Sequence, residues 1–115
     1  MRDTAAVVER FNRAFVERDA GLLVDLVGEG CVMEAVSPAP DGERVVGREE
    51  CLRWWGVLIE DPAVRFTPED VQVAGERATI RWHYAFDGGS MRGVNLMLVR
   101  DGLIVEALGY GKVPA

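Results

Sequence analysis

The sequence is poor in the residues that usually bind metals or carry redox chemistry. It has one histidine, His83, and two cysteines, Cys31 and Cys51, among 115 residues. The cysteines do not form a C-x-x-C motif, so neither a zinc site nor a dithiol redox pair is indicated. We therefore predict that both thiols are buried and reduced, and we expect neither a metal ion nor a cofactor.

Positive charge is also scarce, since 13 Lys and Arg residues stand against 19 Asp and Glu residues and give a net charge of -6. This balance disfavours contact with a phosphate backbone, so nucleic acid is not an expected partner. No apolar run approaches the roughly 20 residues of a membrane span, and the charged N-terminal residues are unlike a signal peptide. We expect a cytoplasmic protein with no membrane partner.

Apolar residues are abundant by comparison. They make up 49% of the chain, and charged residues make up 28%, which is typical of a soluble globular protein. A chain of this length buries roughly 65% of its unfolded surface when it folds, which is enough for one core. We therefore predict a single domain over residues 1–115.

The first half of the sequence predicts three helices. They span about residues 4–17, 19–27 and 49–59, and Gly28 and Gly30 are predicted to end the second one. The apolar positions at helical spacing are Val8, Phe11 and Phe15 in the first helix, Leu22, Leu23, Leu26 and Val27 in the second, and Cys51, Leu52, Trp54, Trp55, Leu58 and Ile59 in the third.

The remaining segments predict strands. Residues 31–36 form a short strand, the proline-rich segment 37–42 forms a loop, and residues 43–46 form a second small strand. From Val64 onward apolar residues alternate with polar ones, which predicts a meander of antiparallel strands whose last turn is the Asp-Gly pair at 101–102. Helices followed by a sheet indicate an α+β domain.

One strand of this meander, residues 78–86, has two unlike faces. Its bulky apolar face consists of Ile80, Trp82, Tyr84 and Phe86, and its other face consists of Thr79, Arg81, His83 and Ala85. We predict that the aromatic face meets the helices.

Asn95 is the only polar side chain between Gly93 and Val99 in the strand that leads into the last turn. An amide on a central strand either faces a cavity or is satisfied by a protein partner in the core or at an interface. We predict that it faces a pocket. A neutral amide there can orient a ligand carbonyl or stabilise developing negative charge.

Two further residues are candidates for proton transfer. His83 is the only side chain with an ordinary pKa near neutral pH, but alternation with Trp82 and Tyr84 puts it on the opposite face, where solvent or a subunit interface is the other interpretation. Glu34 lies near the predicted pocket mouth as a possible general base, whereas a shift of one residue would send it to the other face of the sheet.

The strand that carries Asn95 also predicts a partner. Val94, Leu96 and Leu98 face away from Asn95, so they form an apolar patch on the outer face of the sheet. Such a patch usually has a cover, and we predict a homodimer in which two outer sheet faces meet.

The order of these elements, the Gly47-Arg48-Glu49 start of the third helix and the Arg100-Asp101-Gly102-Leu103-Ile104-Val105-Glu106 hairpin are similar to those of the nuclear transport factor 2-like superfamily. The SnoaL-like and ketosteroid isomerase-like members are the nearest in pattern, and the resemblance covers essentially the whole chain. It implies a cystatin-like fold, in which three N-terminal helices wrap a curved antiparallel sheet into a cone with a pocket inside.

The resemblance also implies a set of catalytic groups. Ketosteroid isomerases of this family hold an oxyanion with a helix tyrosine and a sheet aspartic acid, and they use an aspartate base. Matching by element puts these roles at Phe11, Asn95 and Ala35, of which only Asn95 has a polar side chain. Limonene epoxide hydrolase relatives carry two aspartates, and the matching positions here are His83 and Gly109. Both sets of carboxylates are therefore missing.

Two functions remain open. One is a small-molecule-binding domain whose apolar aromatic pocket holds a hydrophobic cyclic metabolite. The alternative is an isomerase, cyclase or epoxide hydrolase-like enzyme for a polyketide- or steroid-like substrate, with Asn95 and Trp55 as donors and Glu34 or His83 as the proton handler. A carboxylate of Glu34 or Asp87 within reach of the pocket interior would favour the enzyme. The predicted ligand contacts are Phe11, Phe15, Ala35, Trp55, Ile59, Trp82, Tyr84, Phe86, Asn95 and Met97.

Overall fold

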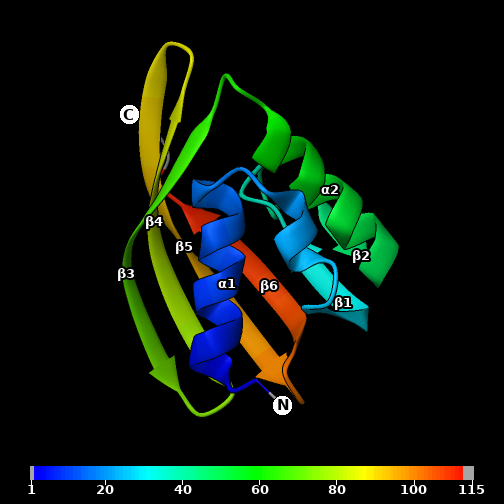
Figure 1. The fold of residues 1–115 in the computed structure, drawn as a ribbon. Helices are drawn as coiled ribbons and strands as arrows, with labels where there is room; N and C mark the ends of the chain where they lie inside the picture. Colours follow the sequence, from blue (N-terminus) through cyan, green and yellow to red (C-terminus); the bar gives the residue numbers. More distant parts are fainter. Residues whose placement is uncertain (1, 113–115) are drawn as a thin grey trace.

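Residues 2–112, which the computed structural model describes, form two α-helices, one short 3-10 helix and six strands (Figure 1). The elements follow one another as α1 (Thr4–Val16), the 3-10 helix η1 (Ala20–Leu23), β1 (Val27–Glu34), β2 (Arg44–Val46), α2 (Arg48–Glu60), β3 (Arg65–Ala74), β4 (Arg77–Phe86), β5 (Gly89–Arg100) and β6 (Leu103–Gly111).

Both α-helices begin where the sequence provides a start signal. At α1 the Asp3 carboxylate accepts a hydrogen bond of 2.8 Å from the backbone N–H of Ala6. At α2 the N-cap is Gly47, whose φ of 103° suits glycine, and Glu49 and Glu50 place negative charge beside the positive end of the helix dipole. The faces that these helices bury are those that the apolar spacing predicted, including Phe11 on α1 and Trp55 on α2.

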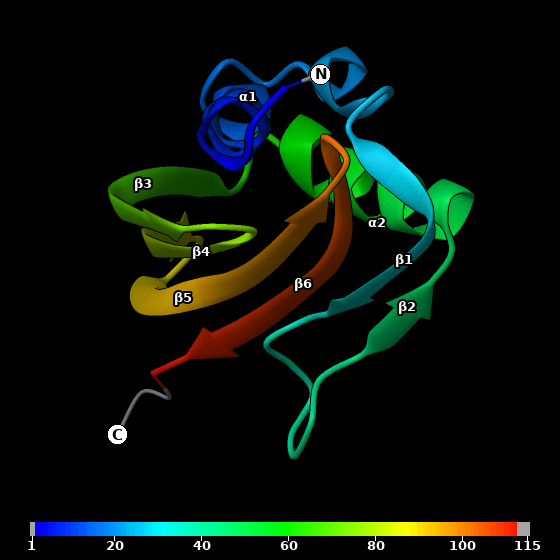
Figure 2. The same ribbon diagram turned by 90° about the horizontal axis from the view of Figure 1, so that it is seen from below.

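The strands form one sheet in the order β2-β1-β6-β5-β4-β3. All neighbours are antiparallel except β1 and β6, which run parallel. Asp101 and Gly102 both have positive φ, at 52° and 75°, which is the backbone that a tight hairpin turn between β5 and β6 needs. Figure 2 shows that the sheet curves around α1 and α2, so the α+β class predicted from the sequence is confirmed.

The prediction of a second α-helix over residues 19–27 was wrong. The 3-10 helix ends at Leu23, and Val27 already begins β1. Leu26 O accepts a hydrogen bond of 2.7 Å from Ile104 N, and Val27 pairs with Ile104 in the parallel ladder. Gly28 and Gly30 therefore lie within a strand and end no helix. Pairing with β6, 77 positions further along the chain, overrides the helical spacing of the leucines.

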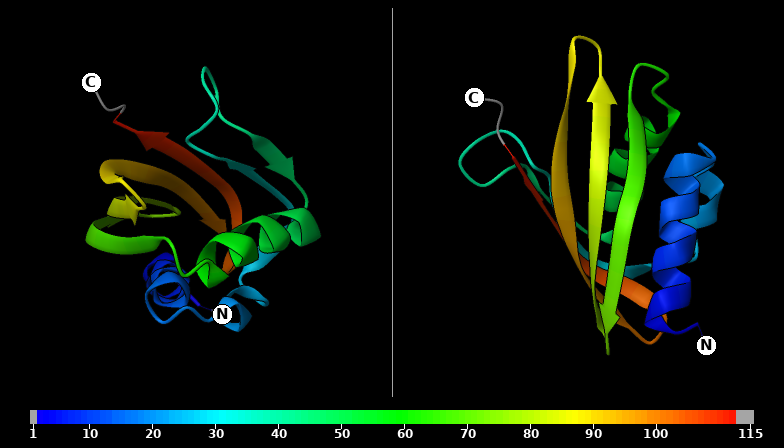
Figure 3. Two further views of the ribbon diagram at one scale, coloured as in Figure 1. Left: turned by 90° about the horizontal axis from the view of Figure 1, so that it is seen from above. Right: turned by 90° about the vertical axis from the view of Figure 1, so that its left-hand side faces the viewer.

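The core lies between the concave face of the sheet and the helices. Figure 3 shows in two views that the helices lie on this side of the sheet. Its largest fully buried side chains include Leu23, Leu26, Ile80, Met97 and Ile104. Neither α-helix of residues 2–112 combines the length and the apolar composition that a membrane-spanning helix requires.

The two cysteines lie in this core, as predicted. Both are free and buried, Cys31 on β1 and Cys51 on α2. The Cys51 Sγ lies 3.6 Å from the carbonyl oxygen of Cys31 and 3.7 Å from that of Val45, so the thiol can donate to either. Burial raises the pKa of both thiols, and the neighbouring Cys51 raises that of Cys31 further.

Candidate functional site

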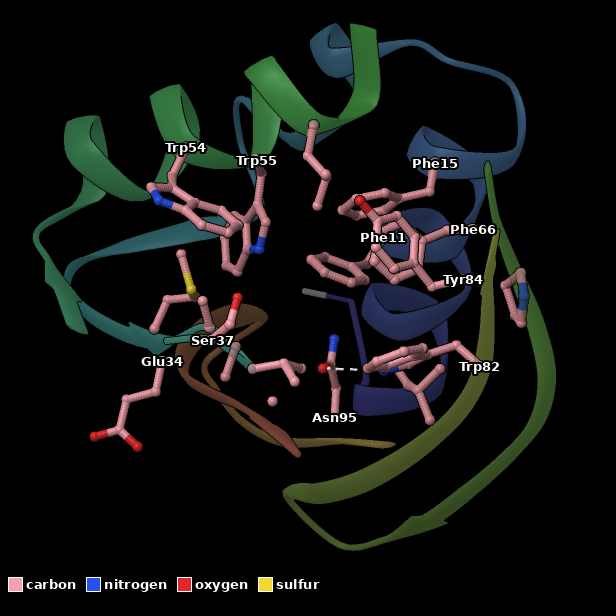
Figure 4. Close-up of a pocket in the computed structure, with 18 of the residues that line it drawn as sticks. Phe11, Phe15, Glu34, Ser37, Trp54, Trp55, Phe66, Trp82, Tyr84 and Asn95 are labelled. Carbon is pink, nitrogen blue, oxygen red and sulfur yellow. Dashed lines mark hydrogen bonds between the residues drawn. The ribbon is translucent and has the colours of Figure 1, made fainter. Parts of the chain in front are cut away.

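A cavity of about 390 Å³ lies where the helices and the concave face of the sheet diverge (Figure 4). Helix α1 provides one wall, α2 a second, and the strands the floor. The loop after β1, residues 35–43, forms part of the rim. The lining residues are Phe11, Asn12, Phe15, Met33, Glu34, Ala35, Val36, Ser37, Ala39, Trp54, Trp55, Leu58, Phe66, Pro68, Ile80, Trp82, Tyr84, Met91, Asn95, Ala107 and Gly109.

Aromatic rings in mutual contact form most of one side of the cavity. Phe66 is stacked on Tyr84 with ring centroids 4.6 Å apart, and it meets Phe15 and Trp82 at 5.3 Å each in edge-to-face geometry. Both arrangements are preferred by aromatic pairs and add about 0.5–1.5 kcal/mol beyond area burial. The rings therefore support one another and form one continuous aromatic wall.

Asn95 lies at the floor of the cavity and is hydrogen-bonded to a neighbour. The Trp82 indole Nε1–H donates to Asn95 Oδ1 at 3.2 Å. Asn95 lines the cavity, which agrees with the prediction. The alternative, an amide satisfied by a protein partner, holds for its oxygen, which accepts from Trp82.

Other lining residues also have polar tips, among them Asn12, Ser37, Trp55 and Tyr84. The Trp55 indole nitrogen is turned toward the interior in Figure 4, and among residues 2–112 it donates to no protein group. Burial raises the pKa of the Tyr84 phenol, and the negative charge of Asp61 adds to this shift. Tyr84 is therefore a neutral hydroxyl at physiological pH.

Seven of the predicted ligand-contacting residues line the cavity, namely Phe11, Phe15, Ala35, Trp55, Trp82, Tyr84 and Asn95. Three do not. Ile59 and Met97 are buried in the core behind the lining. Phe86 is the last residue of β4, is 36% exposed and contacts Tyr84 from outside the cavity. The alternation of aromatic residues along β4 therefore continues beyond the end of the pocket.

The structure does not bring the carboxylate of Glu34 into the cavity. Its neighbours Met33 and Ala35 face inward, so alternation sends the Glu34 side chain to the outer face, where it forms a salt bridge of 2.8 Å with Arg44. In Figure 4 its carboxylate points away from the other labelled residues. A role as general base is not supported by this position. Asp87, the other acid considered, is an exposed turn residue outside the lining.

His83 also lies away from the cavity. It pairs with Thr67 on β3 and Arg92 on β5, one position from the inward-facing Trp82 and Tyr84. It is half-buried on the outer face of the sheet. The alternation of β4 thus favours the solvent or interface interpretation over proton transfer in the pocket.

Sequence reasoning missed several lining residues, above all Phe66, Asn12, Met33 and Ser37. Asn12, like Phe11, lies on the face of α1 that meets the cavity. Helical spacing along the sequence could have placed it on this face. Phe66 had little signal, because it is a single aromatic residue in the polar run Arg65–Asp70.

The fold is that of the nuclear transport factor 2-like proteins. Such a protein of unknown function from Mesorhizobium loti is 50% identical in sequence, with a TM-score of 0.92 over 96% of this chain and 91% of that chain. A protein from Kribbella flavida, provisionally named a ketosteroid isomerase, is 20% identical, with a TM-score of 0.82 over 97% of this chain and 79% of that one. One from Sinorhizobium meliloti, provisionally named a polyketide cyclase, is 22% identical, with a TM-score of 0.74 over 90% and 92%.

Among the nuclear transport factor 2-like proteins, the chain also matches one particular family. The SnoaL-like domain family matches residues 8–107, and the chain belongs to it. No curated protein matches the sequence. The two relatives below 25% identity show the fold alone.

Proposed function

We propose that this SnoaL-like domain binds a hydrophobic, ring-bearing small molecule in the cavity between the helices and the sheet. The observation that carries the proposal is the wall of mutually packed rings around a space of about 390 Å³. Ligand sites are typically concave, mostly apolar and largely preformed, with a few polar groups that fix orientation. Asn95 and Trp55 provide such groups here.

The catalytic alternative is an isomerase, cyclase or epoxide hydrolase-like enzyme. Two observations support this alternative. One is the names of the Kribbella flavida and Sinorhizobium meliloti relatives, and the other is the N–H groups of Trp55 and Asn95 at the cavity wall. Such reactions also need a group that moves a proton within hydrogen-bond reach of the substrate. The carboxylate of Glu34 and the imidazole of His83 lie on the outer face, so binding is the function that this geometry supports better.

Native mass spectrometry of the protein purified from its own cells tests the binding function. We expect an apolar cyclic compound at one copy per chain, which denaturation releases for identification. Ala35→Phe, which adds a ring at the cavity wall, should abolish retention. Val24→Phe adds the same ring at a position that is 52% exposed and outside the lining, so it should retain the compound. Equal retention by both variants would contradict binding in this cavity.

The outer face of the sheet supports a second proposal, a homodimer. Val94 pairs with Tyr110 and Leu96 with Leu108 across β5 and β6, so these side chains form one continuous patch on that face. Leu96 is 37% exposed and Tyr110 is 55% exposed. Salt bridges such as Arg77 with Glu106 border the patch and provide charges of both signs, which a second copy can meet in a two-fold arrangement.

A further inference from the structure

The orientation of the Asn95 amide is fixed by the chemistry of its neighbour. An indole N–H can only donate, so the atom of Asn95 that lies 3.2 Å from Trp82 Nε1 must be the amide oxygen. The reversed amide would bring two donors face to face. The Asn95 nitrogen is therefore the atom that points into the cavity, as Figure 4 shows, and among residues 2–112 it has no hydrogen-bond partner.

Two glycines make this arrangement possible. Gly93 pairs with Trp82 in the β4–β5 ladder, and a Cβ at position 93 would collide with the indole ring. Gly109 pairs with Asn95 in the β5–β6 ladder, where a Cβ would lie 3.3 Å from Asn95 Oδ1. The backbone thus leaves room for Trp82 to reach diagonally across β5 to the amide.

The electrostatic character of the cavity follows from its polar groups. Asn95 Nδ2 and Trp55 Nε1 offer donors, and neither has a protein acceptor within residues 2–112. The other polar lining groups, such as the Tyr84 and Ser37 hydroxyls, are neutral and can donate or accept. The one carboxylate among the lining residues, that of Glu34, is turned outward to Arg44. A charged ligand would lose its hydration here without gaining a counter-ion, whereas a neutral ligand with an acceptor would satisfy the free N–H groups.

We propose that Trp82 is a positioning residue that holds the Asn95 amide with its nitrogen toward the cavity, and that the cavity thereby selects neutral ring-bearing ligands with a carbonyl or similar uncharged acceptor. The inference rests on the proposed function, because it assumes that the cavity binds an apolar ring compound.

A pair of probes that differ only in the acceptor tests this inference. 1-Tetralone and tetralin share one carbon skeleton, and the ketone adds the carbonyl oxygen. The ratio of their two dissociation constants, measured by NMR titration, is compared between proteins, so that the different water solubilities of the probes cancel. We expect Asn95→Leu to shift the ratio toward tetralin by about five-fold, the size of one lost hydrogen bond.

Trp82→Phe should shift the ratio in the same direction, because it frees the amide to rotate while both probes still enter the cavity. A purely structural role for Trp82 would weaken both probes alike and leave the ratio unchanged. Phe86→Leu, outside the lining, is the control that should keep the wild-type ratio. A second readout needs no variant: 1-tetralone should shift the Asn95 side-chain amide resonances of the wild-type protein, and tetralin should not.

The outcomes separate the two proposals. If both probes bind but perturb the Asn95 amide equally, the acceptor selection is wrong. If Trp82→Phe keeps the wild-type ratio, the positioning role of Trp82 is wrong. In both cases the binding function stands. If neither probe binds the wild-type protein, the proposed function fails and this inference fails with it.

Discussion

The indole of Trp82 lies across the backbone of Gly93, its direct partner in the β4–β5 ladder. A methyl group at position 93 would meet both the indole and the carbonyl oxygen of Tyr110, which cannot move without disturbing β6. Gly93→Ala should therefore lower the free energy of unfolding by about 2 kcal/mol, within the usual range for overpacking. Chemical denaturation of both proteins measures the difference.

A matched control for this substitution is Gly30→Ala in β1. A Cβ at position 30 would meet nothing within 4 Å, so the gain in chain stiffness should leave stability equal or slightly higher. A loss of similar size in both variants would mean that strand glycines in general, rather than the Trp82 contact, determine the effect.

Phe66 connects the aromatic wall of the cavity, since it touches Phe15, Trp82 and Tyr84. Phe66→Leu keeps an apolar side chain but removes all three ring contacts, so we expect a loss of about 1–2 kcal/mol of stability and weaker binding of ring compounds. Thermal unfolding and ligand titration measure the two effects. Phe86→Leu loses only one ring contact at an exposed site and should cost less than about 0.5 kcal/mol.

The buried thiols give stability a pH dependence with a definite sign. Burial raises the pKa of Cys31 and Cys51 in the folded protein above the usual value of about 8.5, so the folded state retains their protons after the unfolded state has lost them. The contribution of the two protonated thiols to the free energy of unfolding is complete below about pH 8.5. It is lost as the pH rises above that value, at up to about 1.4 kcal/mol per pH unit for each thiol.

Urea denaturation at pH values from 7 to 9.5 measures this slope. Cys31→Ala removes one of the two titrating groups, so its stability should fall less steeply with pH, whatever its stability at pH 7. A slope identical to that of the wild-type protein would show that folding does not raise the pKa of Cys31. Iodoacetamide provides an independent check, because native thiols with a raised pKa should react slowly at pH 8.

The features that the sequence predicted well depend on neighbours along the chain. The turn at Asp101-Gly102 needs only the backbone freedom of those two residues. The inward direction of Trp82 and the outward direction of His83 follow from the alternation of one strand. The capped start of α1 depends on Asp3 and a backbone N–H three residues later.

The features that it missed depend on distant partners. The end of η1 is decided by the pairing of Val27 with Ile104, which local helical spacing does not encode. The bond between Trp82 and Asn95 requires the β4–β5 register and the empty position at Gly93 together. Glu34 is the direct neighbour of the inward-facing Ala35, and successive residues of a strand point to opposite faces of the sheet. An error of one residue in the register therefore moves the Glu34 side chain from one face to the other.

The outer sheet face provides the last prediction. If two copies of this face meet, a charge at its centre must be buried without a partner, which typically costs several kcal/mol. Leu96 lies at that centre, next to Leu108 in the β5–β6 ladder. Multi-angle light scattering at micromolar concentration should give twice the chain mass of 12.7 kDa for the wild-type protein and the single mass for Leu96→Glu. Val57→Glu, at a position that is 71% exposed on α2, should remain dimeric. A wild-type mass of 12.7 kDa would exclude the homodimer, and the apolar patch around Leu96 would then need another cover.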